Sequence, residues 1–102
     1  MTIIDGMFED CSNLVDISEV ANWDTSKVKL MGSMFCNCEK LANINPLASW
    51  NTSNVTDMKL MFRRTKITNL SALANWDTSN VQRMGGMFDG CSKLANLNGT
   101  SN

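Results

Sequence analysis

The stretch NWDTSNVQRMGGMFDGCSKL, residues 75–94, contains a pattern that returns along the whole chain. Residues 23–38 and 50–65 align without a gap on residues 76–91 of this stretch. The aligned phenylalanines are spaced by 27, 27 and 26 residues, at Phe8, Phe35, Phe62 and Phe88. The single spacing of 26 reflects the loss of one residue between Thr65 and Ile67. A pattern that returns at a nearly fixed period predicts a protein built of stacked repeats.

The first half of each unit has a spacing typical of a short helix. In the third unit the apolar residues fall at positions i, i+3, i+6 and i+7, which are Val55, Met58, Met61 and Phe62. This spacing places side chains on one face of a helix. An Asp/Asn-Thr-Ser sequence precedes each such run, and its side-chain oxygens can accept hydrogen bonds from the first N–H groups of a helix. We therefore predict one short helix in each unit.

Each predicted helix ends at a residue expected to adopt the left-handed backbone conformation. These residues are Asp10, Asn37, Arg64 and Gly90. Glycine, asparagine and aspartate adopt this conformation more readily than other residues. Arg64 does not fit this preference and lies beside the missing residue, so we expect the third unit to be distorted there.

The second half of each unit predicts a short strand. Its apolar residues recur every third position, as in Leu41, Ile44, Leu47 and Trp50. We expect parallel strands near residues 16–18, 43–45, 69–71 and 96–98, because equivalent segments of stacked repeats lie side by side. The aligned Phe, Trp, Met, Leu and Cys columns would then form one continuous core. We interpret residues 1–102 as a single repeat domain, with units at approximately 1–22, 23–49, 50–75 and 76–102.

The pattern in residues 75–94 resembles the BspA-like leucine-rich repeat of bacterial surface proteins, and the resemblance covers essentially the whole chain. It implies an α/β fold, a leucine-rich-repeat-like right-handed solenoid with one short helix and one short parallel strand per 26–27-residue repeat. This chain departs from the pattern at Thr65, where the usual cysteine is missing, and in having Cys36.

The resemblance also implies a location and a function. It implies display outside the cell or on the cell surface of a bacterium, as part of a longer protein, and adhesion to host or matrix proteins for some members. No signal peptide is visible in this chain, since no basic region precedes an apolar stretch at the N-terminus.

Charge and hydropathy argue against two classes of partner. The formal net charge of −1 provides no overall basic field that would attract nucleic acid. No apolar run approaches the roughly 20 residues needed to span a membrane, so no membrane insertion is expected. The charge is uneven, however, because residues 1–25 contain six acids and no base.

The cysteines allow several interpretations. Cys11, Cys38 and Cys91 occupy one column of the repeat, beside the core phenylalanines, so small buried side chains are expected there. A disulfide between Cys11 and Cys38 is an alternative, because adjacent turns are close. A zinc site is not expected, because the spacing does not bring four sulfurs to one tetrahedron. Cys36 lies outside the column and would be the more reactive thiol if it were exposed.

Catalysis and cofactor binding find little support. The chain contains no histidine and no tyrosine, which removes the usual proton shuttles. Met-x-x-Met pairs recur and would suit copper(I), but they share a face with Val and Phe that must be buried for the repeats to stack. We therefore expect no enzyme, no metal and no cofactor.

A basic cluster lies in the third unit, at Lys59, Arg63, Lys66 and neighbouring Arg64. On the predicted helix, Lys59 and Arg63 would share the outer side. Every Phe and Trp belongs to a core column, so none is free to stack on bases, and nucleic acid is not an expected partner. A solvated helix face, or contact with an anion or an acidic partner, remains.

The strongest candidate for a binding surface is the polar face of the predicted strands. Two columns form it, and their members are Asp16, Asn43, Asn69 and Asn96, with Ser18, Asn45, Ser71 and Asn98. Solenoids use rows of this kind to bind partners. The alternative is that stacked amides hydrogen-bond along the solenoid and only stabilise it.

Two functions are therefore compatible with the sequence. One is a non-enzymatic module for protein binding or adhesion. The other is a structural unit that stacks end to end with other copies, because the exposed ends of a solenoid carry apolar core and unpaired strand edges.

Overall fold

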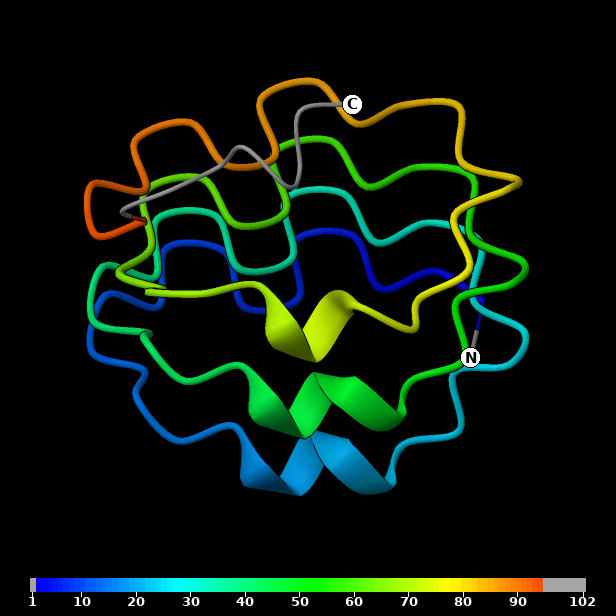
Figure 1. Ribbon diagram of the computed structural model, residues 1–102, viewed down its shortest axis with the longest axis horizontal. Helices are drawn as coiled ribbons and strands as arrows, with labels where there is room; N and C mark the ends of the chain where they lie inside the picture. The colour runs from blue at the N-terminus through cyan, green and yellow to red at the C-terminus, as the bar shows by residue number, and fades with distance from the viewer. Residues whose placement is uncertain (1, 95–102) are drawn as a thin grey trace.

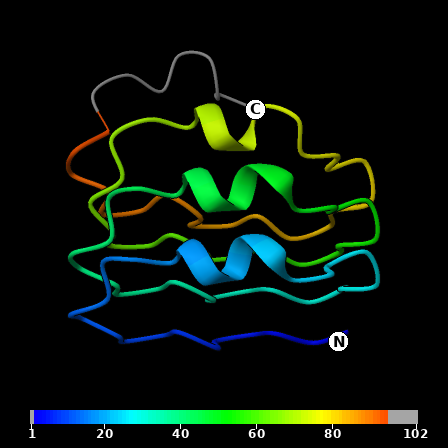
Figure 2. The ribbon, with the colours of Figure 1, turned by 90° about the horizontal axis from the view of Figure 1, so that it is seen from below.

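Residues one repeat apart lie on top of one another. The computed structural model describes residues 2–94, and in it the chain winds through four stacked turns, the fourth of which is described as far as Leu94 (Figures 1 and 2). We number the turns by the phenylalanine that each contains, so that Phe8, Phe35, Phe62 and Phe88 lie in the first, second, third and fourth turns. The tryptophan that follows each phenylalanine belongs to the same turn. The ring centroids of Trp23 and Trp50 are 6.2 Å apart, and those of Trp50 and Trp76 are 6.4 Å apart. Both pairs are nearly parallel, with interplanar angles of 14° and 2°. The prediction that equivalent residues stack is confirmed.

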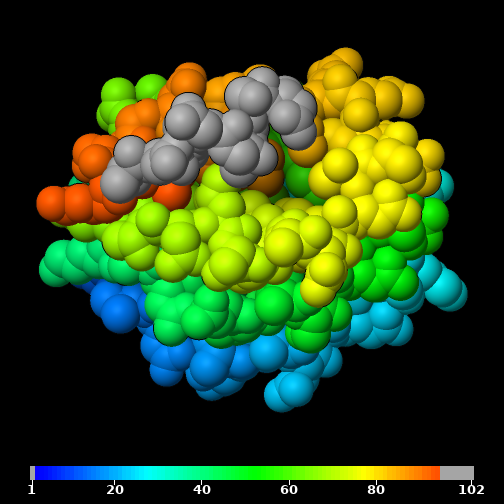
Figure 3. Space-filling view, viewed as in Figure 1, coloured from blue at the N-terminus to red at the C-terminus, as the bar shows by residue number. Residues whose placement is uncertain are grey.

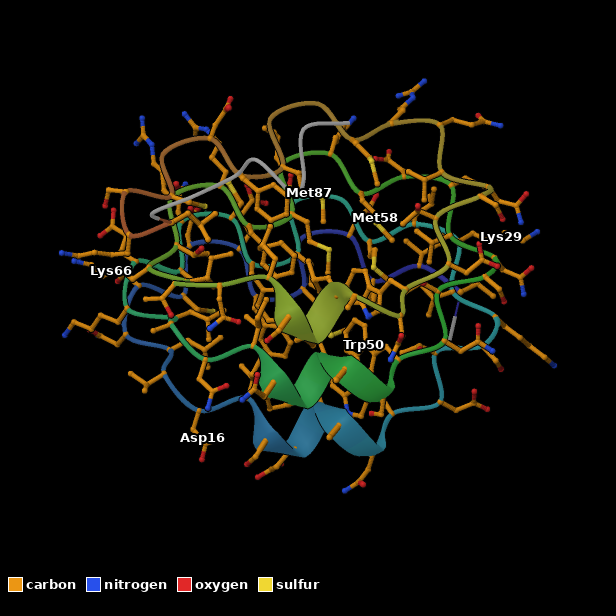
Figure 4. The ribbon with its side chains drawn as sticks, in the orientation of Figure 1. Asp16, Lys29, Trp50, Met58, Lys66 and Met87 are labelled. Carbon is orange, nitrogen blue, oxygen red and sulfur yellow. The ribbon has the colours of Figure 1, made fainter. Side chains whose placement is uncertain are left out.

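The core consists of the predicted columns. Phe35 and Phe62 have centroids 5.8 Å apart, and Phe8 and Phe88 extend this stack at its two ends. The buried methionines are Met31, Met34, Met58, Met61 and Met87, which confirms that the Met-x-x-Met pairs serve mainly as core, although Met84 is 41% exposed. Figure 4 shows Trp50, Met58 and Met87 inside the stack of turns, whereas Lys29 and Lys66 point outward at opposite edges.

Backbone hydrogen bonds connect each turn to the next. The Phe8 amide donates to the Met34 carbonyl, Phe35 to Met61 and Phe62 to Met87, with N···O distances of 3.0, 2.9 and 3.0 Å. The alternate residues Ile4, Gly6 and Asp10 of the first turn likewise donate their amides to carbonyls of the second turn. The parallel bridges Ile3–Leu30, Leu30–Asp57 and Asp57–Arg83 mark one line through all four turns. Space-filling shows the turns as consecutive bands on one face (Figure 3).

The prediction of a short helix in the first half of each unit is wrong. Among residues 2–94, no helix has seven residues or more. The segments are instead undulating ladders, because each contains left-handed residues that an α-helix cannot accommodate. One such column is predicted, and its φ angles are 60–72° at Asp10, Asn37, Arg64 and Gly90. A second column, with φ of 57–67°, was not predicted and consists of Gly6, Ser33, Leu60 and Gly86.

The helix-like spacing has another physical origin. Tight turns close at regular intervals along each ladder, as when the Met61 amide donates to the Met58 carbonyl and the Thr65 amide to the Phe62 carbonyl. Because these tight backbone turns follow one another along the ladder segment, an apolar side chain returns to the interior about every third residue. An amphipathic helix produces nearly the same spacing, so the pattern alone does not distinguish the two.

The prediction of a short strand in the second half of each unit is also wrong. Three short 3₁₀ helices occupy that half: η1 (Ser18–Asn22), η2 (Asn45–Ser49) and η3 (Ser71–Leu73). Within residues 2–94 the structure has no strand, only isolated bridges. In η2, Pro46 lies near the first position and favours a helix start. Its φ is already close to the helical value, and an N–H at that position would have no partner within the helix, so the lack of one costs little. The three helices stack along one side (Figure 2). The segment 96–98 lies outside the described residues.

The expected distortion at Arg64 is absent from the ladder. Arg64 has φ of 60°, close to the 63° of Asn37, and its amide donates to the Asp89 carbonyl at 2.8 Å, as Asn37 donates to Arg63. The shorter third turn is therefore accommodated after the ladder, between Thr65 and Ile67.

Two adjacent glycines test the ladder against a helix. Gly86 has φ of +67°, and a Cβ added there would lie 2.6 Å from Cδ2 of Leu60. Gly86→Ala should lower the free energy of unfolding by about 1–2 kcal/mol. Gly85 has open space around it, so Gly85→Ala should raise stability by about 0.4–1 kcal/mol. Urea unfolding of both variants measures the difference. A helix would predict stabilisation by both, since alanine is the better helix former at either site.

Candidate functional site

The predicted polar face lies where each turn enters its 3₁₀ helix. Asp16, Asn43 and Asn69 each accept a hydrogen bond at Oδ1 from the backbone N–H two residues later, with distances of 2.8, 2.9 and 3.2 Å. This is the Asx turn, in which a short polar side chain caps the backbone that follows it. The three side chains are exposed, and Figure 4 shows Asp16 pointing away from the turns.

The structure brings six of the eight predicted face residues together. The amides that donate in these Asx turns belong to Ser18, Asn45 and Ser71, which begin η1, η2 and η3. Because the three helices stack (Figure 2), the residues of the two columns recur at the same place in three successive turns. Asn96 and Asn98 lie outside the described residues.

The amide ladder that we considered for this face occurs elsewhere. In the polar face, the Oδ1 atoms of Asn43 and Asn69 bond within their own turns. By contrast, Asn54 Nδ2 donates to the Ser26 carbonyl and Asn80 Nδ2 to the Ser53 carbonyl of the preceding turn, both at 2.7 Å. The side chains of Asn54 and Asn80 therefore connect adjacent turns directly, whereas the hydrogen bonds of Asn43 Oδ1 and Asn69 Oδ1 stay within one turn.

A second set of Asx turns confirms the capping role of the Asp/Asn-Thr-Ser sequences, although they begin a tight turn and not a helix. Asp24, Asn51 and Asp77 accept from the backbone N–H two residues later. The Ser26 and Ser79 hydroxyls, together with the amides of the same residues, lower the pKa of Asp24 and Asp77. The Ser18 amide lowers the pKa of Asp16. A lowered pKa in the folded state means that these carboxylates favour folding at neutral pH, and that this contribution fades as the solution becomes acidic.

All four cysteines are unpaired thiols. In the column of Cys11, Cys38 and Cys91, the predicted burial is confirmed at Cys38, is partial at Cys91 and is wrong at Cys11, which is exposed. The Cys38 thiol donates to the Phe8 carbonyl at 3.0 Å, and the Cys91 thiol donates to the Phe62 carbonyl at 2.9 Å. Burial raises the pKa of Cys38 to about 11. Cys36, which we expected to be the reactive thiol if exposed, is only 3% exposed, whereas Cys11 is exposed.

Thiol labelling should follow this burial. At mildly alkaline pH, Cys11 should react with an alkylating reagent first, because it is accessible and the thiolate is the reacting form. Cys36 and Cys38 should react only after denaturant is added. Mass spectrometry of digested, labelled protein assigns the sites. Labelling of native Cys36 as fast as Cys11 would contradict the packing of the second turn.

The basic residues of the third turn do not share a helix face, because no helix forms there. Arg64 and Lys66 instead line an open groove of about 490 Å³, together with Lys40 and Glu39 of the second turn. This groove is not among the sites that the sequence predicts. The signal that could have found it is the residue missing after Thr65, since the shortening coincides with the groove.

One comparison with known proteins identifies a family. Residues 2–101 match the family described as "Mycoplasma protein of unknown function, DUF285". The chain belongs to this family. No curated protein matches it, and no solved structure matches it. The description of the DUF285 family assigns no activity.

In the part of the chain from residue 2 to residue 94, no three His, Cys, Asp or Glu side chains are grouped so that they could hold a metal ion. No helix within the same residues has both the length and the apolarity required to cross a membrane.

Proposed function

We propose that this chain is a non-enzymatic repeat module for protein binding or adhesion. In this proposal it is part of a longer protein displayed outside a bacterial cell, and its stacked turns form a right-handed, leucine-rich-repeat-like solenoid of the BspA-like kind. The repeat pattern and the stacking of equivalent residues support the solenoid. The absence of histidine and tyrosine from the sequence supports a role without acid–base catalysis.

The observation that carries the proposal is the regular polar face on η1, η2 and η3. Three turns each present an Asp or Asn held by the same kind of Asx turn, so these side chains have a fixed orientation before a partner arrives. Within residues 2–94 the Nδ2 groups of Asn43 and Asn69 donate no hydrogen bond, and both side chains are exposed, so these donors are available to a partner. Pre-organised rows of this kind lower the entropic cost of binding.

The test is binding of the purified chain to a panel of immobilised extracellular-matrix proteins. Asn43→Asp combined with Asn69→Asp retains the capping oxygen but replaces the exposed donors with carboxylates. We expect this variant to bind at least about tenfold more weakly, which corresponds to 1.4 kcal/mol. Its melting temperature should stay near that of the unmodified chain.

A matched control adds the same two charges elsewhere. Asn51→Asp combined with Asn75→Asp changes two exposed asparagines outside the face and should leave binding unchanged. If the unmodified chain binds nothing on the panel, or if the face variant binds as well as the control, the proposal is wrong.

A second candidate function, end-to-end stacking of copies, is favoured by the edge of the first turn. The carbonyls of Ile3, Asp5, Met7 and Glu9 are equivalent to those that accept in the other turns, yet they receive no hydrogen bond from residues 2–94. Ile3 and Met7 are 62% and 47% exposed on this edge. A row of unpaired backbone groups beside apolar side chains can pair with another chain.

The N–H row of the fourth turn of a second copy would complement this edge. Light scattering across a wide concentration series should then show oligomers for the unmodified chain and monomers for Ile3→Lys combined with Met7→Lys. Thr68→Lys, at an exposed site between the two ends, serves as the control and should still associate. A monomer at all concentrations would rule out stacking.

A further inference from the structure

One corner of the stack changes shape at the third turn. In the other turns a hydrogen bond closes the corner from the cysteine column to the next leucine, at Leu14 to Cys11, Leu41 to Cys38 and Leu94 to Cys91, with N···O distances of 3.0, 3.0 and 3.1 Å. The third turn has one residue fewer between Thr65 and Ile67. Its Lys66 amide donates instead to the Leu41 carbonyl of the second turn, at 2.8 Å.

The shortened corner lies at the centre of the groove. Thr65 and Lys66 line it, and so do Ser12 of the first turn, Lys40 of the second and Ser92 of the fourth. The groove therefore crosses all four turns at the edge where Lys66 is labelled in Figure 4. With turns spaced by about 4.8 Å, it spans about 14 Å, the length of about four residues of extended chain.

The groove carries positive charge. Lys40, Arg64 and Lys66 contribute three cations and Glu39 contributes one carboxylate, so the local balance is positive. Arg64 is held at this position by its backbone: its amide donates to the Asp89 carbonyl. Its side chain also lies over Gly90, where an added Cβ would be 2.9 Å from Cγ of Arg64. The remaining lining is polar, including the hydroxyl-bearing Ser12 and Ser92.

We propose that this groove binds an extended acidic segment of a protein partner. Carboxylates on such a segment would pair with Lys40, Arg64 and Lys66, and the serine hydroxyls would hydrogen-bond to the same oxygens. The positive charge and the polar side chains of the lining both favour this ligand over an apolar one. The groove is separate from the polar face on η1, η2 and η3, so it would be a second contact site, and it does not depend on the function proposed for that face.

The probe is a fluorescently labelled hexaglutamate peptide, with hexaglutamine as its neutral counterpart, and the readout is fluorescence anisotropy at low salt. The unmodified chain should bind hexaglutamate and not hexaglutamine, and binding should weaken as salt is added. Arg64→Gln combined with Lys66→Gln should weaken binding by up to about tenfold. Lys29→Gln combined with Lys59→Gln removes the same charge outside the groove lining and should have little effect.

A second variant separates shape from charge. Inserting one alanine after Lys66 restores a 27-residue turn and keeps every cation, so it should fill the groove and abolish binding while far-ultraviolet circular dichroism stays native-like. If the insertion folds and still binds, or if both charge pairs weaken binding equally, the groove is not the site. Equal competition by inorganic sulfate and by hexaglutamate, compared at equal charge, would also overturn the proposal, because it would indicate a simple anion site. Failure of the matrix-protein assay would leave these outcomes unaffected.

Discussion

Phe35→Ala should lower the free energy of unfolding by about 3–5 kcal/mol. The Phe35 ring has no exposed surface and lies between the rings of Phe8 and Phe62, with centroid distances of 5.5 and 5.8 Å. Removing it leaves a cavity that two neighbouring turns both line, and stacked backbones joined by hydrogen bonds cannot easily collapse around it. A loss of this size is a large share of the stability of a domain of about 100 residues.

The matched control is Phe8→Ala, at the end of the same column. Phe8 is only half-buried, and its stacking partners in the Phe and Trp columns are Phe35 and Trp23. Its loss should therefore be smaller than that of Phe35. Urea unfolding followed by circular dichroism measures both. Equal losses for the two variants would mean that the column does not have a buried middle and an open end.

Trp50→Ala should have an effect of similar size, about 3–5 kcal/mol. Trp50 is 4% exposed, stacks between Trp23 and Trp76, and donates from Nε1 to the Val20 carbonyl of the preceding turn at 2.8 Å. The indole thus joins three turns by packing and two by a hydrogen bond.

Two substitutions separate these contributions. Trp50→Phe keeps an aromatic ring but loses the donor, so we expect a smaller loss that includes about 1 kcal/mol for the hydrogen bond. Trp23→Phe, in the first turn, serves as the control, because Trp23 is only half-buried. Thermal melting followed by near-ultraviolet circular dichroism is a suitable measurement. Wild-type-like melting of Trp50→Ala would mean that this column is not part of the core.

The stacking of the turns could be predicted because it depends on side chains that the sequence repeats. Trp23, Trp50 and Trp76 recur at the period of the chain, and equal side chains at equal positions pack on one another when turns stack. The left-handed conformation at Asn37 and Gly90 could be predicted for a similar reason, because these residue types tolerate it.

The local backbone was harder to predict, because two conformations share one apolar spacing. Leu60 has φ of 57°, a conformation that leucine disfavours. The peptide group between Lys59 and Leu60 holds it there, because its carbonyl accepts from the Ser33 amide of the second turn and its N–H donates to the Gly85 carbonyl of the fourth. The paired glycines Gly85 and Gly86 argue against a helix interior, since glycine weakens helices there. Pro46, directly after Asn45, similarly indicates a helix start where we expected a strand.

The candidate sites differ in the same way. Asp16, Asn43 and Asn69 could be placed on one exposed face because they recur at the repeat period, but their Asx turns depend on the 3₁₀ helices that follow. The groove at Lys66 depends on how a missing residue is accommodated between two unshortened neighbours, which periodicity does not specify.

The most direct test is the detection of scalar couplings across backbone hydrogen bonds by nuclear magnetic resonance on isotopically labelled protein. Stacked turns predict couplings from the Phe35 amide to the Met61 carbonyl and from the Phe62 amide to the Met87 carbonyl. A coupling from the Phe35 amide to the Met31 carbonyl, the partner in an α-helix, would instead contradict the account.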